Sequence, residues 1–191
     1  VYSGKYGCKT LIESGLKTVE RTRLLLSEIP TATSMLQGGR EQKVVVPKAV
    51  YLCAAFTGKL DLLLWMHQEP RYTLSLLDIN ICSKAALGGH LKVLQWARAN
   101  GCPWNADTCK NAARNGHLEV LKWARANGCP WDVFTCPAAA ENGHLEVLRW
   151  ARSSNYCPWD TYTCSSAAEN GHLEVLKWAR TNGWKHLFCC S

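Results

Sequence analysis

Two consecutive stretches decide the fold of this chain: residues 116–142 read GHLEVLKWARANGCPWDVFTCPAAAEN, and residues 143–170 read GHLEVLRWARSSNYCPWDTYTCSSAAEN. A third copy, GHLKVLQWARANGCPWNADTCKNAARN, occupies residues 89–115, and a fourth copy begins at Gly171 with GHLEVLKWARTNGW. The copies follow one another without a gap and are nearly equal in length. A degenerate copy precedes them over residues 54–65. Their spacing lies within the range of roughly 20–50 residues that is the signature of a repeat architecture.

Each copy contains a longer and a shorter expected helix. Over Leu118 to Arg125, at about 100° per residue, the apolar side chains fall in one arc and the charged side chains lie opposite, as in an amphipathic helix. Glu119 and Lys122 are three residues apart on the charged side, which is the spacing of an ion pair. An Asn-Gly pair follows most of these helices, because glycine readily adopts the left-handed backbone that ends a helix.

The shorter helix has two different sides. Thr108 is its expected N-cap, with Thr135 and Thr163 in the same role in the next copies. Small residues, such as Cys109 and Ala112, project to one side and hardly change between copies, whereas the residues on the other side do change. Small side chains allow a neighbouring helix to approach closely, so the pattern predicts one packed face and one free face.

We therefore expect an all-α fold in which about five helix pairs stack between about Val50 and Arg180. A single pair cannot cover its apolar side, whereas stacked pairs share one continuous core. The tryptophans are expected in that core or under the connecting turns. They are Trp96, Trp123, Trp150 and Trp178 for the core, and Trp104, Trp131 and Trp159 for the turns.

The combination AAxNGHLEVLKWAR followed by NGCPWDxxTC resembles the ankyrin repeat, in the short variety common in large DNA viruses and in some algae and oomycetes. The resemblance covers roughly residues 50–183. The copies are about six residues shorter than the 33 of an ordinary ankyrin repeat, and Thr-Cys replaces the usual Thr-Pro-Leu-His opening. The missing residues would form the projecting β-hairpin, so little or no β-hairpin is expected here.

The resemblance implies that a protein partner binds on the concave surface, which the shorter helices and the turns before them would form. Phe134 and Tyr162 are candidate anchors, because aromatic residues dominate interface hot spots; the alternative is that they pack against their own turns. The expected partner-binding residues are Asn105, Ala106, Lys110, Asn111, Arg114, Val133, Phe134, Pro137, Ala138, Glu141, Thr161, Tyr162, Ser165, Ser166 and Glu169.

The two ends of the chain lie outside the repeat. In residues 1–49, apolar residues from Leu11 to Ile29 have helical spacing, which predicts an amphipathic helix near 10–29 that either caps the first repeat or docks a second partner. Residues 50–183 form the repeat region, and residues 184–191 form a tail that does not resume the pattern. No apolar run is long enough to predict a membrane span.

The recurring histidines and cysteines do not predict a metal or a catalytic site. Equivalent residues on stacked helices lie about 8–10 Å apart, whereas zinc–ligand bonds are about 2.0–2.3 Å long. A catalytic site needs one special constellation, but here every copy has the same surroundings. We expect no enzyme activity, no cofactor and no metal, with the cysteines as small buried residues and the imidazoles bracing the Gly-His turn.

Composition favours a folded protein, with 47% hydrophobic and 19% charged residues. Eleven cysteines would suit a disulfide scaffold, but their odd number and repeated positions favour packing roles in a reducing intracellular compartment. We expect that compartment to be the cytoplasm or nucleus, or an organelle if a targeting segment was removed. The leading prediction is a protein-interaction scaffold. The alternatives are a structural accessory subunit of a larger, for example organellar, assembly and a nucleic-acid binder, which the net charge of +7 keeps open although its basic residues are scattered.

Overall fold

The computed structural model describes residues 44–45, 48–68, 72–73, 78–154, 156 and 161–182. Within them the helices come in five consecutive pairs, which confirms the predicted repeat of helix pairs. The pairs are α2 (Lys48–Thr57) with α3 (Leu60–Gln68), α4 (Asn80–Gly88) with α5 (Leu91–Ala99), α6 (Ala106–Arg114) with α7 (Leu118–Ala126), α8 (Thr135–Glu141) with α9 (Leu145–Ser153), and α10 (Thr161–Glu169) with α11 (Leu173–Thr181). The helix expected near 10–29 and the tail at 184–191 lie outside the described residues.

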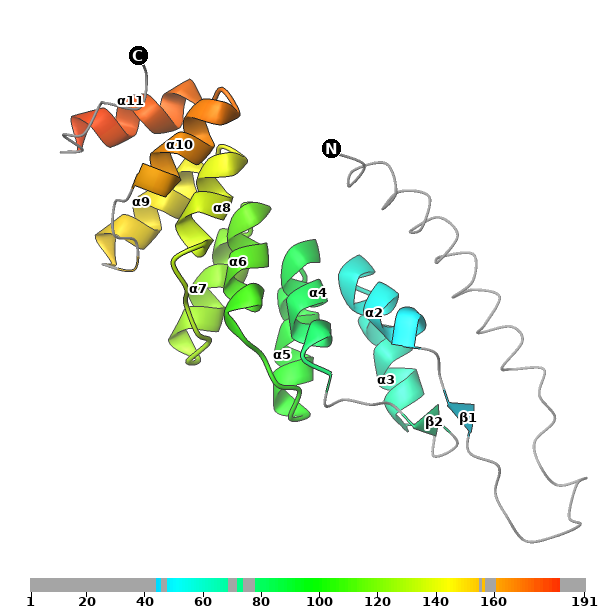
Figure 1. Cartoon of the computed structure of the whole chain (residues 1–191). Coiled ribbons are helices and arrows are strands. Elements are labelled where there is room, and N and C mark those ends of the chain that lie inside the picture. Colours follow the sequence, from blue (N-terminus) through cyan, green and yellow to red (C-terminus); the bar gives the residue numbers. More distant parts are fainter. Residues whose placement is uncertain are drawn as a thin grey trace, which may run out of the picture.

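The first helices of the pairs form one row, and the second helices form another (Figure 1). In the first row, α2, α4, α6, α8 and α10 each pack directly on the next, and each second helix packs on the first helix of its own pair. The second helices pack less closely on one another than the first helices do. The stack therefore curves toward the first row, and we call the surface of this row the concave face (Figure 1).

Small residues on the first helices allow this close packing, as the sequence predicts. The two consecutive alanines of each first helix are completely buried from α2 to α8, and the first of the two is completely buried in α10. Close approach of helices through alanine brings many backbone and side-chain atoms into contact. The residues are Ala54, Ala55, Ala85, Ala86, Ala112, Ala113, Ala139, Ala140 and Ala167. A valine and a leucine from most of the second helices complete the core: Val93, Leu94, Val120, Leu121, Val147, Leu148 and Val175.

The Gly-His turn joins the helices of a pair and also joins neighbouring pairs. After α8, the His144 amide donates to the Ala139 carbonyl at 2.9 Å, a helix-ending bond of the Schellman type, while Gly143 has a φ of +72°. One repeat later, the His172 ring lies against Gly143, and its Nε2 donates to the Glu141 carbonyl at 2.9 Å. The expected bracing role of histidine is thus found on the turn of the preceding repeat. The same contact joins His90 to Gly58, His117 to Gly89 and His144 to Gly116.

The predicted N-caps are displaced from the observed helix starts. The N-cap of α6 is Asn105, whose side chain accepts a hydrogen bond from the Asp107 amide at 3.1 Å. Because this bond starts the helix earlier, Thr108 lies in the first turn and is buried, and its predicted role as the N-cap is wrong. Thr163 likewise lies inside α10, and Thr135 is the first residue of α8, with its hydroxyl donating to Asp132 Oδ1 at 2.8 Å.

The tryptophans lie at the edge of the core. Trp104, in the turn after α5, packs edge-on against Trp123 of α7 with ring centroids 5.9 Å apart. Trp131, after α7, meets Trp150 of α9 in a tilted arrangement at 6.2 Å. All four rings are partly buried and packed against the core, so the prediction that Trp123 and Trp150 lie within the core is wrong in this respect. Trp159 lies outside the described residues.

The second helices carry ion pairs on their exposed side. The expected ion pairs on the charged side of the second helices are present: Glu119 with Lys122, Glu146 with Arg149, and Glu174 with Lys177.

The strands β1 (Val44–Val45) and β2 (Tyr72–Thr73) pair in parallel, with α2 and α3 between them in sequence. Strands this short have no hydrophobic alternation to reveal them, so the sequence does not predict this pair. No helix in the described ranges is both long and apolar enough to cross a membrane.

Candidate functional site

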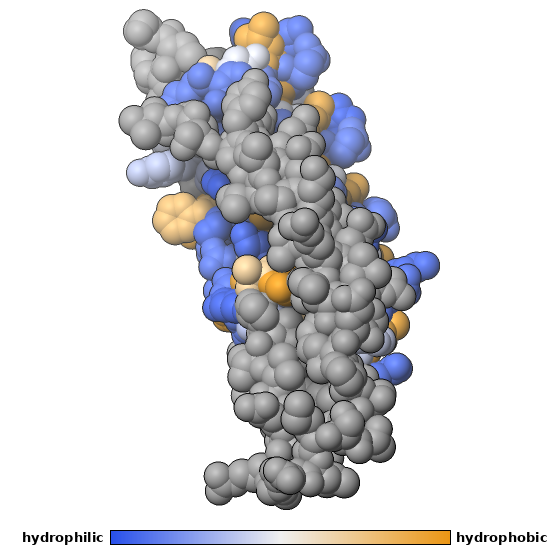
Figure 2. Space-filling model, turned by 90° about the vertical axis from the view of Figure 1, so that its right-hand side faces the viewer, coloured by the Kyte–Doolittle hydropathy of each residue, from blue (hydrophilic) through white to orange (hydrophobic). Residues whose placement is uncertain are grey.

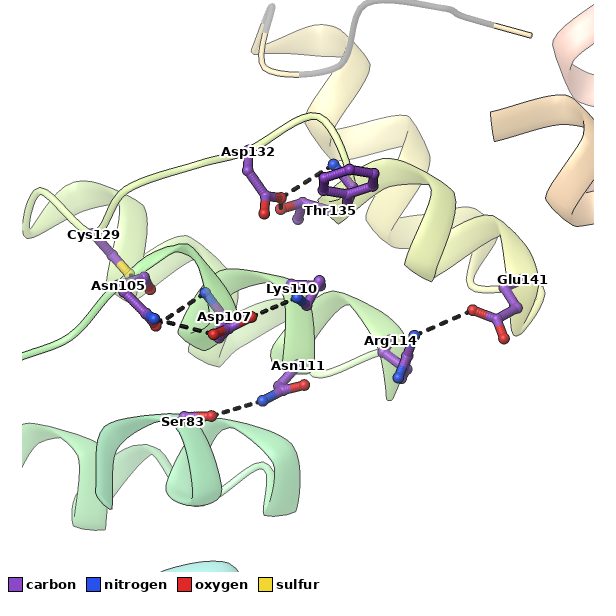
Figure 3. Close-up of polar contacts among 11 residues, drawn as sticks. Ser83, Asn105, Asp107, Lys110, Asn111, Arg114, Cys129, Asp132, Thr135 and Glu141 are labelled. Carbon is purple, nitrogen blue, oxygen red and sulfur yellow. Dashed lines mark hydrogen bonds and ion pairs between the residues drawn. The ribbon is translucent and has the colours of Figure 1, made fainter. Parts of the chain in front are cut away.

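The candidate site is the concave face of α6, α8 and α10, together with the turns that precede these helices. Figure 3 shows polar contacts of the part formed by α6 and α8. The structure places most of the predicted partner-binding residues at the surface. Those that are exposed are Arg114, Val133, Phe134, Thr161, Tyr162 and Glu169. Those that are half-buried are Asn105, Ala106, Lys110, Asn111, Glu141, Ser165 and Ser166.

Pro137 and Ala138 are the exceptions, because both are buried. The prediction that they lie on the free face is wrong. Helix α8 packs between α6 and α10, and these two side chains are too short to extend past the neighbouring helices. Positions 137 and 138 therefore belong to the stack and cannot anchor a partner.

Three large apolar side chains project from this region. Val133 is 64% exposed, Phe134 is 58% exposed and Tyr162 is 69% exposed. The Asp132 carboxylate accepts hydrogen bonds from the Phe134 amide at 3.1 Å and from the Thr135 hydroxyl at 2.8 Å, which holds the backbone at the start of α8. Phe134 and Tyr162 occupy equivalent positions in consecutive repeats, so they stand at the same end of two adjacent helices. The alternative that they pack against their own turns does not fit these exposures.

Polar residues of the concave face connect neighbouring first helices. Asn111 Nδ2 of α6 donates to Ser83 Oγ of α4 at 2.7 Å. Arg114 of α6 pairs with Glu141 of α8, with 3.4 Å between Nη2 and Oε2 (Figure 3). Some of the residues that vary between copies thus also connect neighbouring repeats, because each of these two contacts crosses from one repeat to the next.

An ionic cluster marks the start of α6. The pKa of Asp107 is lowered, chiefly because Lys110 donates a hydrogen bond to its carboxylate. Asn105 donates to the other carboxylate oxygen at 3.0 Å. A carboxylate in the first turn also suits the positive end of the helix dipole. These residues stabilise the start of the helix.

The residues predicted from the sequence do not include the corresponding positions of α4. Ser83 and Lys84 are half-buried on α4, and Ser83 takes part in the contact with Asn111. Their positions follow from counting one repeat back from Lys110 and Asn111, so the repeat spacing contains the signal. The candidate face therefore extends one repeat further toward the N-terminus than predicted.

The histidines face the stack rather than the concave face. Burial lowers the pKa of His117, and the neighbouring imidazoles of His90 and His144 lower it further. Burial also lowers the pKa of His144. In the part of the chain that the structure describes, no three His, Cys, Asp or Glu side chains come together as a metal-binding group.

Cysteines of the first helices meet cysteines of the turns that close the same pairs. The Cys82 thiol of α4 donates to the Cys102 carbonyl at 3.9 Å, and hydrogen bonding to the Cys102 side chain together with burial raises the pKa of Cys82. Hydrogen bonding to the Cys129 side chain and burial raise the pKa of Cys109 of α6 in the same way, and all four residues are completely buried. Cys136 of α8 is disulfide-bonded. Cys136 is buried, as predicted for the repeated cysteines, and its disulfide is a feature that the sequence pattern does not predict.

The face seen in Figure 2 carries separate hydrophobic spots among hydrophilic side chains. A surface of this kind can form apolar contacts and hydrogen bonds with another macromolecule. No protein-family model matches the chain, and the comparison with curated proteins gives no match.

Proposed function

We propose that this chain is a non-catalytic protein-interaction scaffold, an ankyrin-type repeat whose concave face binds a protein partner. The observation that carries the proposal is the pair of exposed aromatic residues, Phe134 at 58% and Tyr162 at 69%, in equivalent positions of consecutive repeats. Clustered exposed apolar residues mark interaction sites, and aromatic side chains contribute most to interface hot spots.

The packing around these residues supports the proposal in a second way. The first helices are held side by side by buried alanines and by the Asn111–Ser83 and Arg114–Glu141 bonds. Such a platform positions its exposed side chains before a partner arrives. Binding to a preorganised surface loses less conformational entropy than binding to a mobile one.

Affinity purification with crosslinking mass spectrometry on the full chain tests the proposal, because it identifies the partner and maps the contact face. The double variant Phe134→Ala/Tyr162→Ala should then weaken binding by about 30-fold or more, since truncating a hot-spot residue costs roughly 2 kcal/mol. Leu173→Ala is the matched control: Leu173 is an equally exposed apolar residue, but it begins α11 in the second row. Circular dichroism should show that both variants keep their helices.

Unchanged affinity of the aromatic double variant, or an equal loss in Leu173→Ala, would contradict the concave-face assignment. The same purification distinguishes the two alternatives. A permanent accessory subunit would co-purify with an assembly at fixed stoichiometry. A nucleic-acid binder would recover nucleic acid with an affinity that falls steeply as salt rises.

A further inference from the structure

The cysteine pairs carry an inference that the proposed function does not use. Each pair joins the first helix of a repeat to the turn that follows the second helix of the same repeat: Cys82 in α4 to Cys102 after α5, and Cys109 in α6 to Cys129 after α7. The two partners are equally far apart in the sequence in both pairs. The contact thus closes the helix pair on itself.

The next repeat shows the oxidised form of the same position. Cys82, Cys109 and Cys136 are equivalent residues of three consecutive copies, and Cys136 of α8 is disulfide-bonded. Cys157, the sequence counterpart of Cys129, lies outside the described residues. Four consecutive first helices, α4 to α10, therefore carry a cysteine at one equivalent position, which is reduced in Cys82 and Cys109 and oxidised in Cys136.

We propose that Cys82 with Cys102 and Cys109 with Cys129 are redox pairs, each of which forms a disulfide within its repeat by exchange with a low-molecular-weight disulfide such as oxidised glutathione. The outcome is a stack whose helix pairs are covalently closed under oxidising conditions and open under reducing ones.

A nearby arginine distinguishes the two cysteines of each pair. The pKa of Cys102 is lowered because Cys82 donates a hydrogen bond to its sulfur, and the Arg98 guanidinium lowers it further. Cys129 has the same arrangement, with Cys109 as the donor and Arg125 as the nearby cation. A thiolate beside a cation is the form of cysteine that attacks a disulfide. The same two guanidinium groups donate hydrogen bonds to the backbone carbonyls of Cys102 and Cys129, so the cation lies at the turn cysteine in both pairs. We therefore assign the turn cysteine as the attacking group and the helix cysteine as the group that completes the reaction.

The exchange conserves atoms and electrons. The Cys102 thiolate attacks one sulfur of oxidised glutathione, which forms a mixed disulfide and releases one glutathione thiolate; that thiolate takes up the proton that Cys102 lost. Cys82 then loses its proton and attacks the Cys102 sulfur, which breaks the mixed disulfide and releases the second glutathione with that proton. The protein loses two electrons, and oxidised glutathione gains them. Because all four cysteines are completely buried, the exchange proceeds through local opening of the repeat.

The test uses the full chain in buffers of defined oxidised-to-reduced glutathione ratio. After acid quenching, the protein is unfolded, alkylated and digested without reduction, and disulfide-linked peptides are identified by mass spectrometry. We expect Cys82–Cys102 and Cys109–Cys129 peptides to accumulate as the ratio rises, and the unfolding temperature of the oxidised chain to rise by about 5–10 °C. Cys53 in α2, whose pKa is raised by burial alone, is the internal control and should stay alkylated.

Two results would overturn the proposal. The first is that all four cysteines are recovered as alkylated, and therefore reduced, residues under conditions in which Cys136 is disulfide-bonded. The second is that they pair between repeats, for example Cys82 with Cys109. In the variant Cys102→Ala, Cys82 should stay alkylated while the Cys109–Cys129 link still forms; if that variant does not fold, the peptide map of the unmodified chain decides the question by itself.

Discussion

Replacing Gly143 by alanine tests how one repeat is fastened to the next. Gly143 has a φ of +72°, and a Cβ placed there would lie 2.6 Å from Nδ1 of His172. Gly171 ends the next first helix with the same φ of +72°, but a Cβ there would have no heavy atom within 4 Å. Gly171 is thus a matched control: both substitutions strain the backbone, and only Gly143→Ala also displaces a histidine.

The expected magnitudes follow from these two contributions. A left-handed backbone costs an alanine roughly 1–2 kcal/mol, so Gly171→Ala should lower the free energy of unfolding by about that amount. Gly143→Ala must also move the His172 ring, which then loses its bond of 2.9 Å to the Glu141 carbonyl. A lost hydrogen bond costs roughly 0.5–1.5 kcal/mol more, which gives roughly 1.5–3.5 kcal/mol in total.

Urea unfolding followed by tryptophan fluorescence measures the free energy of unfolding of both variants. The comparison requires that the slope of this free energy against urea concentration, the m value, is the same in the two variants. A double-mutant cycle with His172→Ala isolates the contact, because in that background Gly143→Ala should cost no more than Gly171→Ala does alone. Equal costs for the two glycine variants, or a coupling energy below about 0.3 kcal/mol, would refute the inference that the histidine fastens the preceding turn.

Two further predictions concern the same stack. Burial holds the pKa of His117 and His144 below the ordinary 6.5, so that as the pH falls these two residues are protonated in the unfolded chain before they are protonated in the folded chain. The free energy of unfolding should therefore be highest above about pH 6.5 and should decrease as the pH drops below that value. Urea midpoints measured from about pH 8 to pH 5 check this, and His117→Gln/His144→Gln should flatten the profile; an equally steep profile in the variant would contradict the assignment. Asn105→Ala should lower the free energy of unfolding by about 0.5–2 kcal/mol through loss of the α6 N-cap, and Asn105→Ser should retain most of the stability, as measured by the same urea titration.

The sequence predicts which residues of the candidate site lie at the surface, but it does not predict the contacts that these residues make. Variation between copies marked Arg114 and Glu141 as residues away from the packed face, and both do reach the surface. Their ion pair across α6 and α8 could not be predicted, because it depends on how neighbouring repeats are rotated relative to each other. Pro137 and Ala138 were misassigned for the same reason: a helix wheel describes one helix, whereas burial depends on the helices on both sides.

The cysteines and histidines show this limit most clearly. Repetition of Cys at fixed places indicated packing, and only the three-dimensional arrangement shows that the cysteine of a first helix meets the cysteine of the turn that closes its pair. The Gly-His turn was visible as a motif, but its imidazole contacts the turn of the repeat before it, which is distant in the chain.

The sequence by itself determined the helix pairs, their number and the small residues on the packed side of each first helix, because helical periodicity and the regular spacing of the copies are local properties that one chain displays repeatedly. Only the tertiary structure decided which polar residues bridge repeats, where the tryptophans lie, which thiols are paired and which aromatic side chains remain in water. These properties depend on the distance and rotation between adjacent repeats, and they are set when the helices pack together.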